Sequence, residues 1–339
     1  MQMALASRLA SEQRARPRAT AGPSLVRQAQ AEQNRWVSQD EPGRPPHPGA
    51  VALANIQIDV TTRLGVPRLA MTTGLPTLDR HLGGGLRPGN VLALVSAPGS
   101  GRTTLALLMA YMAARSRAAA LFSGVTLDDT EIVARLAARA LHRERPDAQV
   151  PYGAIWSGQS QQEPESLPLV MNAVDTVMRK VGTQLYLYRA ASLEPTGGLA
   201  ERAAQLWSRF ERVLLVVDDI EGFYASADGS ASKQAAVNAT LEGRVAQVAF
   251  DLKAIAEQGC AVVVTALARH AELLAPAVDA LVQITEPASA RGVIPEALIA
   301  LGARNVELNI LKSRYGSTGA VGLRLVPGVG LAEERARPE

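Results

Sequence analysis

The sequence predicts an α/β fold in which a mostly parallel sheet is covered by helices on both faces. An apolar run, Val91 to Val95, is followed by a glycine-bearing turn and a helix-forming run, Leu105 to Ala114. A second fully apolar run, Val213 to Val217, ends in Asp218-Asp219, and further short apolar runs alternate with helical patterns. Strands that are apolar throughout are typical of parallel sheets buried on both faces, in which ligands bind at the carboxyl ends of the strands.

Length and composition favour one large domain with tails. The chain has 339 residues, of which 47% are hydrophobic, and its net charge of +3 excludes a global basic field. Residues 1–50 hold several prolines and seven arginines against four acids, so we expect a basic, disordered tail. We expect a linker segment at 51–70, the α/β domain at 71–330 and a short tail at 331–339.

Compartment and membrane association can be predicted from the same composition. Cys260 is the single cysteine, which excludes disulfides within the chain and suits a reducing cytosol. No apolar run approaches the ~20 residues of a membrane span, and the first residues lack an uninterrupted apolar core of a secretory signal. We therefore expect a cytoplasmic protein without a membrane anchor.

The turn after Val95 has the pattern of a phosphate-binding loop. The usual pattern is G-x-x-x-x-G-K-[ST], and the window Ser96 to Thr103 departs from it by Ser96 and Arg102. Such a loop directs successive backbone N–H groups, and the positive end of the following helix, at a phosphate. The alternative is an ordinary glycine-rich turn. The predicted phosphate contacts are Pro98, Gly99, Ser100, Gly101, Arg102, Thr103 and Thr104.

Asp218 is the second position with chemical importance. A carboxylate at the end of a buried strand can hold Mg²⁺ through water while the Thr103 hydroxyl binds the ion directly. Asp219 and Glu221 are alternatives, since a strand end can direct either neighbour inward. A carboxylate that only caps the next element is the other interpretation of Asp218.

The remaining elements follow from periodicity and capping signals. Asp128 and Glu131 resemble a capping box at the start of a helix that runs to about His142. Residues 146–166 lack periodicity and are expected to form a loop or an insertion. The other predicted strands are Ala118 to Phe122, Gln184 to Arg189 and Ala261 to Ala266, and the other predicted helices are Leu167 to Val181, Leu199 to Phe210 and Asn238 to Gln258.

Two alternating segments near the end of the chain predict a β-hairpin. Apolar residues recur at every second position from Val306 to Ile310 and again from Val321 to Leu325. Lys312 and Arg314 lie in the connecting segment, two residues apart and close to glycines. We expect both cations to reach outward from the hairpin.

Together these motifs resemble the RecA-type C-terminal domain of DnaB-type replicative helicases, over roughly Met71 to Val326. The hairpin pattern Lys312-x-Arg314-x-Gly316 is the most selective of them, because the phosphate-binding loop alone occurs in many unrelated nucleotide hydrolases. The other motifs in the family's order are Thr73-Gly74, Leu78-Asp79, Gly83 to Leu86, the Ser96 to Thr103 loop, the strand before Asp218, and Asp251 to Ala256.

The resemblance implies a RecA-like sheet and an oligomeric ring or filament of like or related subunits. It further implies that ATP and Mg²⁺ lie between subunits, that single-stranded DNA is bound, and that the protein acts in DNA replication or a related DNA transaction. Lys312 and Arg314 would then contact the γ-phosphate of the neighbouring subunit, with Arg314 the better candidate for the arginine finger. Asp218 would be the catalytic carboxylate that holds the metal.

Three departures from the family's pattern concern its chemistry. Val125 stands where the family has a water-polarising glutamate, Ala266-Leu267 stands for its Ser-Gln pair, and Arg102 replaces the lysine. Degenerate motifs of this kind predict weak or absent hydrolysis. Asp128, Asp129 or Glu221 is a candidate substitute base that could polarise the water, so an active ATP-dependent helicase or translocase remains an alternative. The second alternative is a non-catalytic protein with a structural or partner-binding role.

Overall fold

The structure is a computed structural model that describes residues 60–61, 64, 69–126, 128–226, 238–287 and 294–335. The chain divides into two units, Met1–Val66 and Pro67–Glu339, and every element described below belongs to the second unit. The expected tail at 1–50, most of the expected linker and the segment 336–339 lie outside the described residues.

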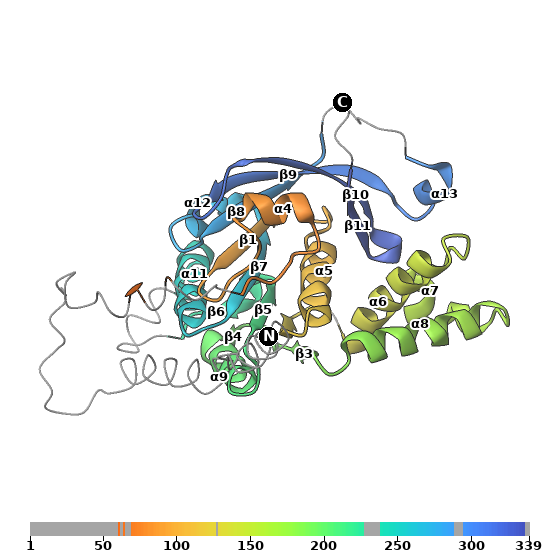
Figure 1. The fold of residues 1–339 in the computed structure, drawn as a ribbon, viewed down its shortest axis with the longest axis horizontal. Helices are drawn as coiled ribbons and strands as arrows, with labels where there is room; N and C mark the ends of the chain where they lie inside the picture. The colour runs from red at the N-terminus through yellow and green to blue at the C-terminus, as the bar shows by residue number, and fades with distance from the viewer. Residues whose placement is uncertain are drawn as a thin grey trace, which may run out of the picture. The chain divides into compact units, whose positions relative to one another are not determined.

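A nine-stranded sheet forms the centre of this unit, in the order β11-β10-β9-β8-β1-β7-β5-β2-β3 (Figure 1). The six strands from β8 to β3 are parallel, and β9, β10 and β11 continue the sheet in antiparallel fashion. The strands are β1 (Val91–Ser96), β2 (Ala119–Gly124), β3 (Leu185–Arg189), β5 (Val213–Asp218), β7 (Ala261–Leu267), β8 (Ala280–Thr285), β9 (Arg304–Ser313), β10 (Gly319–Val326) and β11 (Leu331–Glu334). A separate pair consists of β4 (Glu194–Pro195) and β6 (Phe223–Tyr224). The predicted α/β class with a mostly parallel sheet is confirmed.

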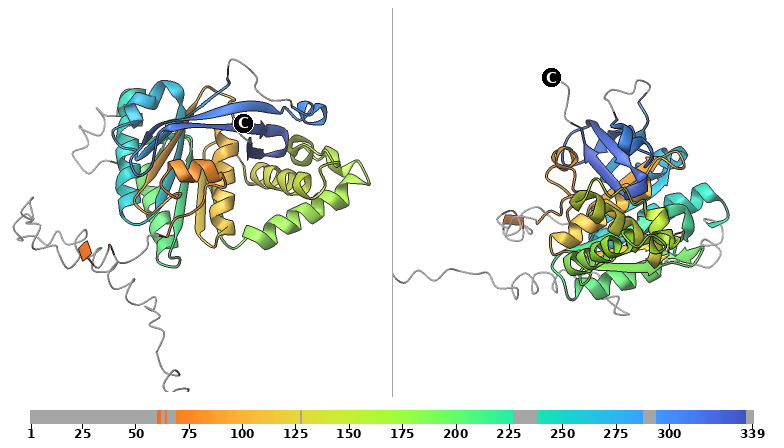
Figure 2. Two further views of the ribbon diagram at one scale, coloured as in Figure 1. Left: turned by 45° about the horizontal axis from the view of Figure 1, so that its top comes forward. Right: turned by 90° about the vertical axis from the view of Figure 1, so that its right-hand side faces the viewer.

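Helices cover both faces of the sheet, because alternate residues of each buried strand point to opposite faces. Leu92 and Leu94 of β1 join the core cluster that contains α5, whereas Val91, Ala93 and Val95 join the cluster that contains α9 and α11. Figure 2 shows α5 and α11 on opposite sides of the strands. The parallel strands are therefore buried on both sides, as their apolar sequences predict.

The helices fall into a set that covers the sheet and a lobe of three helices at one side of it (Figure 1). The lobe contains α6, α7 and α8, and α6 also packs on the end of β10 and the start of β11. The α-helices are α4 (Pro76–His81), α5 (Arg102–Arg115), α6 (Asp129–Glu144), α7 (Tyr152–Trp156), α8 (Ser166–Val181), α9 (Thr196–Trp207), α11 (Leu241–Glu257), α12 (Ala271–Leu274) and α13 (Glu296–Ile299).

The structure differs from the expectations in several places, and short elements such as α4, α12 and α13 were not predicted. Strand β8 has no counterpart among the predicted elements. The segment expected as a loop at 146–166 contains the short helix α7. The segment expected as a tail at 331–339 instead begins with β11, because Leu331 and Ala332 are buried and pair with β10.

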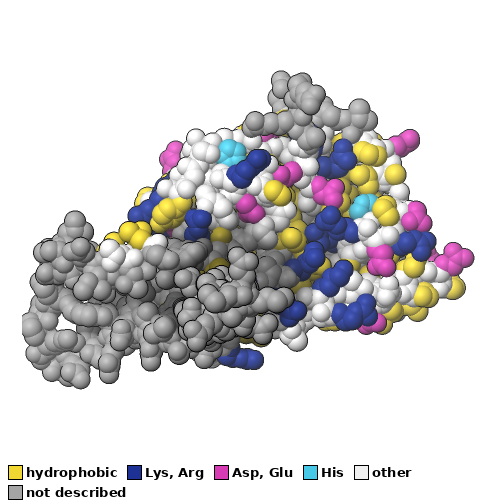
Figure 3. Space-filling view, in the orientation of Figure 1, with side chains coloured by type: hydrophobic (Ala, Val, Ile, Leu, Met, Phe, Trp, Pro, Cys, Tyr) yellow, Lys and Arg dark blue, Asp and Glu magenta, His cyan; other side chains and the backbone are white. Residues whose placement is uncertain are grey.

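The surface carries charges of both signs. On the face shown in Figure 3, acidic and basic side chains are interspersed, and several Lys and Arg side chains gather between the sheet and the lobe of α6, α7 and α8. Such a gathering is local, as the small net charge predicts. Among the helices that the structure describes, none is both long and apolar enough to cross a membrane.

Candidate functional site

The phosphate-binding loop joins β1 to α5 at the carboxyl edge of the sheet. Gly99 and Gly101 have φ angles of 76° and 94°, which favour glycine. A Cβ atom at Gly101 would lie 2.2 Å from Cδ2 of Leu325, so a side chain there would also displace the Leu325 side chain of β10. The sequence of the turn therefore follows from its backbone and from its contact with the hairpin.

The first turn of α5 is arranged to receive an anion. It has no side-chain cap on its N–H groups and no acidic residue. These N–H groups have no partner within the helix, and the positive end of the helix dipole lies at the same place. Pro98 and Gly99 are exposed on the loop, with Ser100, Gly101, Arg102 and Thr103 partly exposed and Thr104 buried.

Thr103 and Asp218 meet at this edge, although 115 residues separate them in the chain. The Thr103 hydroxyl donates a hydrogen bond of 2.8 Å to Oδ2 of Asp218, and the Thr265 hydroxyl donates one of 2.5 Å to Oδ1. Burial raises the pKa of Asp218, while these hydrogen bonds and the charges of Arg102 and Arg135 act in the opposite direction. A hydroxyl and a carboxylate beside a phosphate-binding loop are oxygen ligands of the kind that Mg²⁺ prefers. The two residues therefore fit the predicted role.

Arg102 acts on the same carboxylates through its positive charge. It lowers the pKa of Asp218 and of Asp219, against the effect of burial. Its Nη1 atom is buried and has no hydrogen-bond partner within the described part of the chain. A buried cationic donor without a partner is costly unless a ligand supplies an acceptor, so Arg102 is available for a phosphate oxygen.

The alternative carboxylates have different surroundings. Burial, followed by the negative charges of Glu221 and Asp218, raises the pKa of Asp219. Asp128 caps α6 by accepting a hydrogen bond of 2.6 Å from the backbone N–H of Glu131, as the capping box predicts. That contact engages Asp128 in the helix start, which weakens its candidacy as a substitute base.

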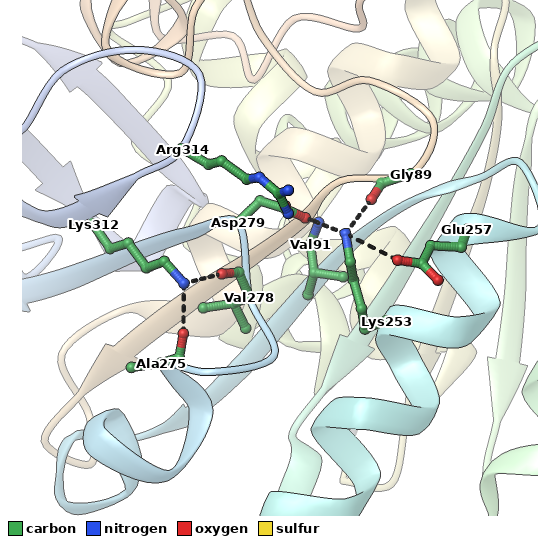
Figure 4. Close-up of polar contacts among 9 residues, drawn as sticks. All are labelled: Gly89, Val91, Lys253, Glu257, Ala275, Val278, Asp279, Lys312 and Arg314. Atoms are coloured by element: carbon green, nitrogen blue, oxygen red, sulfur yellow. Dashed lines mark hydrogen bonds and ion pairs between the residues drawn. The ribbon is translucent and has the colours of Figure 1, made fainter. Parts of the chain in front are cut away.

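Lys312 and Arg314 lie at the opposite edge of the sheet, near the beginning of β1 (Figure 4). The Lys312 Nζ donates hydrogen bonds of 2.6 and 2.7 Å to the carbonyl oxygens of Ala275 and Val278. The expectation that Lys312 reaches outward is therefore wrong for this arrangement, since its own chain occupies the ammonium. Arg314 keeps 61% of its side chain exposed and contacts Oδ1 of Asp279 at 3.3 Å.

Close packing against α4 explains why the hairpin motif has a glycine at Gly316. A Cβ atom at Gly316 would lie 2.0 Å from the carbonyl oxygen of His81, at the end of α4. The neighbouring Ser317 N–H donates a hydrogen bond of 3.0 Å to the same carbonyl oxygen, and the Ser313 hydroxyl donates one of 2.7 Å. The turn that presents Arg314 is thus fixed to α4.

Asp279 is a buried carboxylate that joins the hairpin to the sheet, and no motif in the sequence pointed to it. Its Oδ2 accepts hydrogen bonds of 2.9 Å from the Val91 N–H and from the Lys253 Nζ, and the Arg314 N–H donates one of 2.9 Å to its carbonyl oxygen. Only 3% of its side chain is exposed. Its partners come from β1, α11 and the hairpin turn, so the three elements depend on one carboxylate (Figure 4).

Asp279→Ala is expected to lower the free energy of unfolding by about 3 to 5 kcal/mol, because it leaves the Lys253 ammonium without its buried partner. Urea denaturation followed by circular dichroism measures the change. The exposed Asp175 on α8 provides the control, and Asp175→Ala is expected to change stability by no more than about 0.5 kcal/mol. A loss below about 1 kcal/mol in Asp279→Ala would show that the network contributes little.

Comparisons with known proteins agree with this architecture. Residues 70–150 match a family of unknown function, DUF7125, which covers less than half of the chain. No curated protein sequence matches the chain. A solved structure described as a DnaB-like replicative helicase and its interactions with primase is similar with a TM-score of 0.63 and 15% identity, over 84% of this chain and 67% of that one.

A second similar structure is described as an ATPase domain, with a TM-score of 0.63 and 15% identity. The match covers 85% of this chain and 99% of that domain. At this identity the similarity shows the fold alone. The chain therefore has a RecA-like fold, which it shares with the structure of a DnaB-like replicative helicase and with this ATPase domain.

Proposed function

We propose that this protein is a DnaB-helicase-like nucleotide-binding subunit that takes up ATP with Mg²⁺ and acts on single-stranded DNA in a ring or filament, with weak or absent hydrolysis. The observation that carries the proposal is the contact of 2.8 Å between Thr103 and Asp218, beside the uncapped first turn of α5. This arrangement provides a phosphate cradle and two oxygen ligands for a divalent cation. Thr103 would bind the ion directly and Asp218 through water, and the ion would neutralise phosphate charge.

The position of Arg314 supports an assembly of several subunits. Arg314 lies near Val91 at the beginning of β1, whereas the phosphate-binding loop begins after Ser96 at its end. Six strand residues span about 20 Å, which is more than an arginine side chain can bridge. To act on nucleotide, Arg314 therefore has to reach the site of a neighbouring subunit. In this proposal Lys312 stabilises its own subunit through its hydrogen bonds to Ala275 and Val278. It can reach the γ-phosphate of a neighbouring subunit only if assembly breaks these hydrogen bonds.

The DNA-related part of the proposal has a different basis. It follows from the fold shared with DnaB-like helicases, together with the hairpin motif, and places the protein in DNA replication or a related DNA transaction. A cytoplasmic location fits the single cysteine, Cys260, which is buried and free and suits a reducing compartment.

Mg²⁺-dependent binding of ATP tests the nucleotide site. We expect weak binding by the wild type, because the usual lysine is absent, and a further loss of about tenfold or more in Thr103→Ala. Isothermal titration calorimetry with ATP, with and without Mg²⁺, measures both effects. Thr183→Ala changes an exposed threonine in the turn before β3 and serves as the matched control. Equal binding by the wild type and Thr103→Ala would show that the loop is not the nucleotide site.

A further inference from the structure

Glu221 lies in a 3-10 turn, Ile220–Gly222, that follows β5 and Asp218. One oxygen, Oε1, accepts hydrogen bonds of 2.7 Å from the Leu267 N–H and 2.8 Å from Nδ1 of His270. The other oxygen, Oε2, is buried and has no hydrogen-bond partner among the described residues. A buried carboxylate oxygen without a donor is costly, so it indicates a place for a ligand or a water molecule.

His270 fixes the orientation of this carboxylate. Only 2% of its side chain is exposed, and Nε2 lies 3.2 Å from Nε of Arg269. Because a guanidinium can only donate, Nε2 accepts, and the proton of the neutral ring is on Nδ1. The imidazole therefore donates to Oε1 of Glu221 and leaves Oε2 free to accept from another donor.

The turn lies at the same edge of the sheet as the phosphate-binding loop. Leu267, which donates to Glu221, ends β7, and β7 runs between β1 and β5. Two residues earlier in β7, Thr265 donates to Asp218. On the other side, a Cβ atom at Gly222 would lie 2.5 Å from Cγ2 of Val125, which follows β2. The turn that carries Glu221 thus lies between the ends of β7 and β2, and it follows directly after the strand that ends in Asp218.

We propose that Glu221 is a catalytic residue that orients the water for ATP hydrolysis through Oε2, and that His270 is its positioning residue. This inference rests on the proposed nucleotide site. Phosphoryl transfer requires an acceptor that aligns the attacking water with the γ-phosphorus. As the water oxygen bonds to phosphorus, the bond from phosphorus to the bridging oxygen breaks and ADP leaves. One proton passes from the water to Oε2 and then to solvent, and ATP and water yield ADP and phosphate.

Single-turnover hydrolysis of Mg-ATP, measured beside equilibrium binding, tests the role of Glu221. Glu221→Gln is expected to slow hydrolysis by about a hundredfold or more, because an amide accepts a proton poorly, while ATP binding changes by less than about threefold. Glu272→Gln alters an exposed glutamate of the nearby α12 and is expected to change neither quantity. The proposal would be overturned if Glu221→Gln hydrolysed ATP at the wild-type rate. It would also be overturned if the wild type bound ATP but did not hydrolyse it.

His270 variants separate positioning from folding. His270→Ala removes the donor to Oε1 and is expected to slow hydrolysis by about tenfold or more, whereas His270→Asn keeps a donor at the position of Nδ1 and restores part of the rate. Thermal unfolding establishes that the variants are folded. Equal rates in both folded variants would refute the positioning role. Absence of ATP binding by the wild type would instead refute the nucleotide site itself, which distinguishes the two failures.

Discussion

Replacing Arg314 with alanine is expected to lower ATP hydrolysis by about a thousandfold and to weaken nucleotide-dependent assembly, while each subunit stays folded. A cation supplied by a neighbouring subunit stabilises the charge that spreads over the γ-phosphate oxygens, and such arginine fingers are commonly worth a thousandfold or more. The side chain is 61% exposed, and its contact with Asp279 is a single ion pair of 3.3 Å. Loss of this pair costs at most about 1 kcal/mol, since Asp279 keeps Lys253 and the Val91 N–H.

Mixing experiments can show that the residue acts between subunits. Arg314→Ala keeps an intact phosphate-binding loop, and Thr103→Ala keeps an intact hairpin. A mixture of the two variants is therefore expected to regain part of the activity that each lacks alone. Arg143 on α6, with 54% of its side chain exposed, provides a control arginine of similar exposure. An inactive mixture, or full activity of Arg314→Ala alone, would contradict the role in trans.

Turnover is expected to be slow, on the order of a hundredfold below the ~10 s⁻¹ typical of enzymes. Val125 carries no proton acceptor and packs against the core cluster that contains α9 and α11, so Glu221 has to orient the water from a different strand end than in the family's pattern. Leu267 contributes only its backbone N–H, which Glu221 already accepts. Arg102 is bulkier than lysine and cannot act as a compact point charge. The three replaced residues belong to one catalytic unit, so their effects on the rate do not add. The expected reduction in turnover is therefore that of a single replacement.

Two kinds of sequence information predicted part of the site. These are local turn and strand patterns, and the fact that parallel strands end at the same edge of a sheet. The glycines and the flanking apolar runs predicted the turn between β1 and α5, and the strand before Asp218 predicted a carboxylate at the same edge. The contact between Thr103 and Asp218 follows from that topology, because both residues come just after or at the carboxyl end of a parallel strand. The metal role of the pair stays a prediction.

Contacts between distant segments could not be predicted in the same way. The partners of Lys312 are carbonyl oxygens at Ala275 and Val278, which carry no side-chain signal. His270 meets Glu221 across 49 residues, and a lone histidine after a strand does not indicate its partner. Strand β11 is short and has only two buried residues, so its pairing with β10 determines it more than its own sequence does.

Steady-state ATP hydrolysis by the wild type, with and without single-stranded DNA, tests the proposed function most directly. We expect a slow, Mg²⁺-dependent turnover that is lost in Asp218→Asn and rises in Arg102→Lys, because lysine restores the compact charge at the phosphates. Turnover that is unchanged in Asp218→Asn would come from another protein in the preparation. A DNA-stimulated turnover near ~10 s⁻¹ in the wild type would contradict weak hydrolysis and identify an active motor.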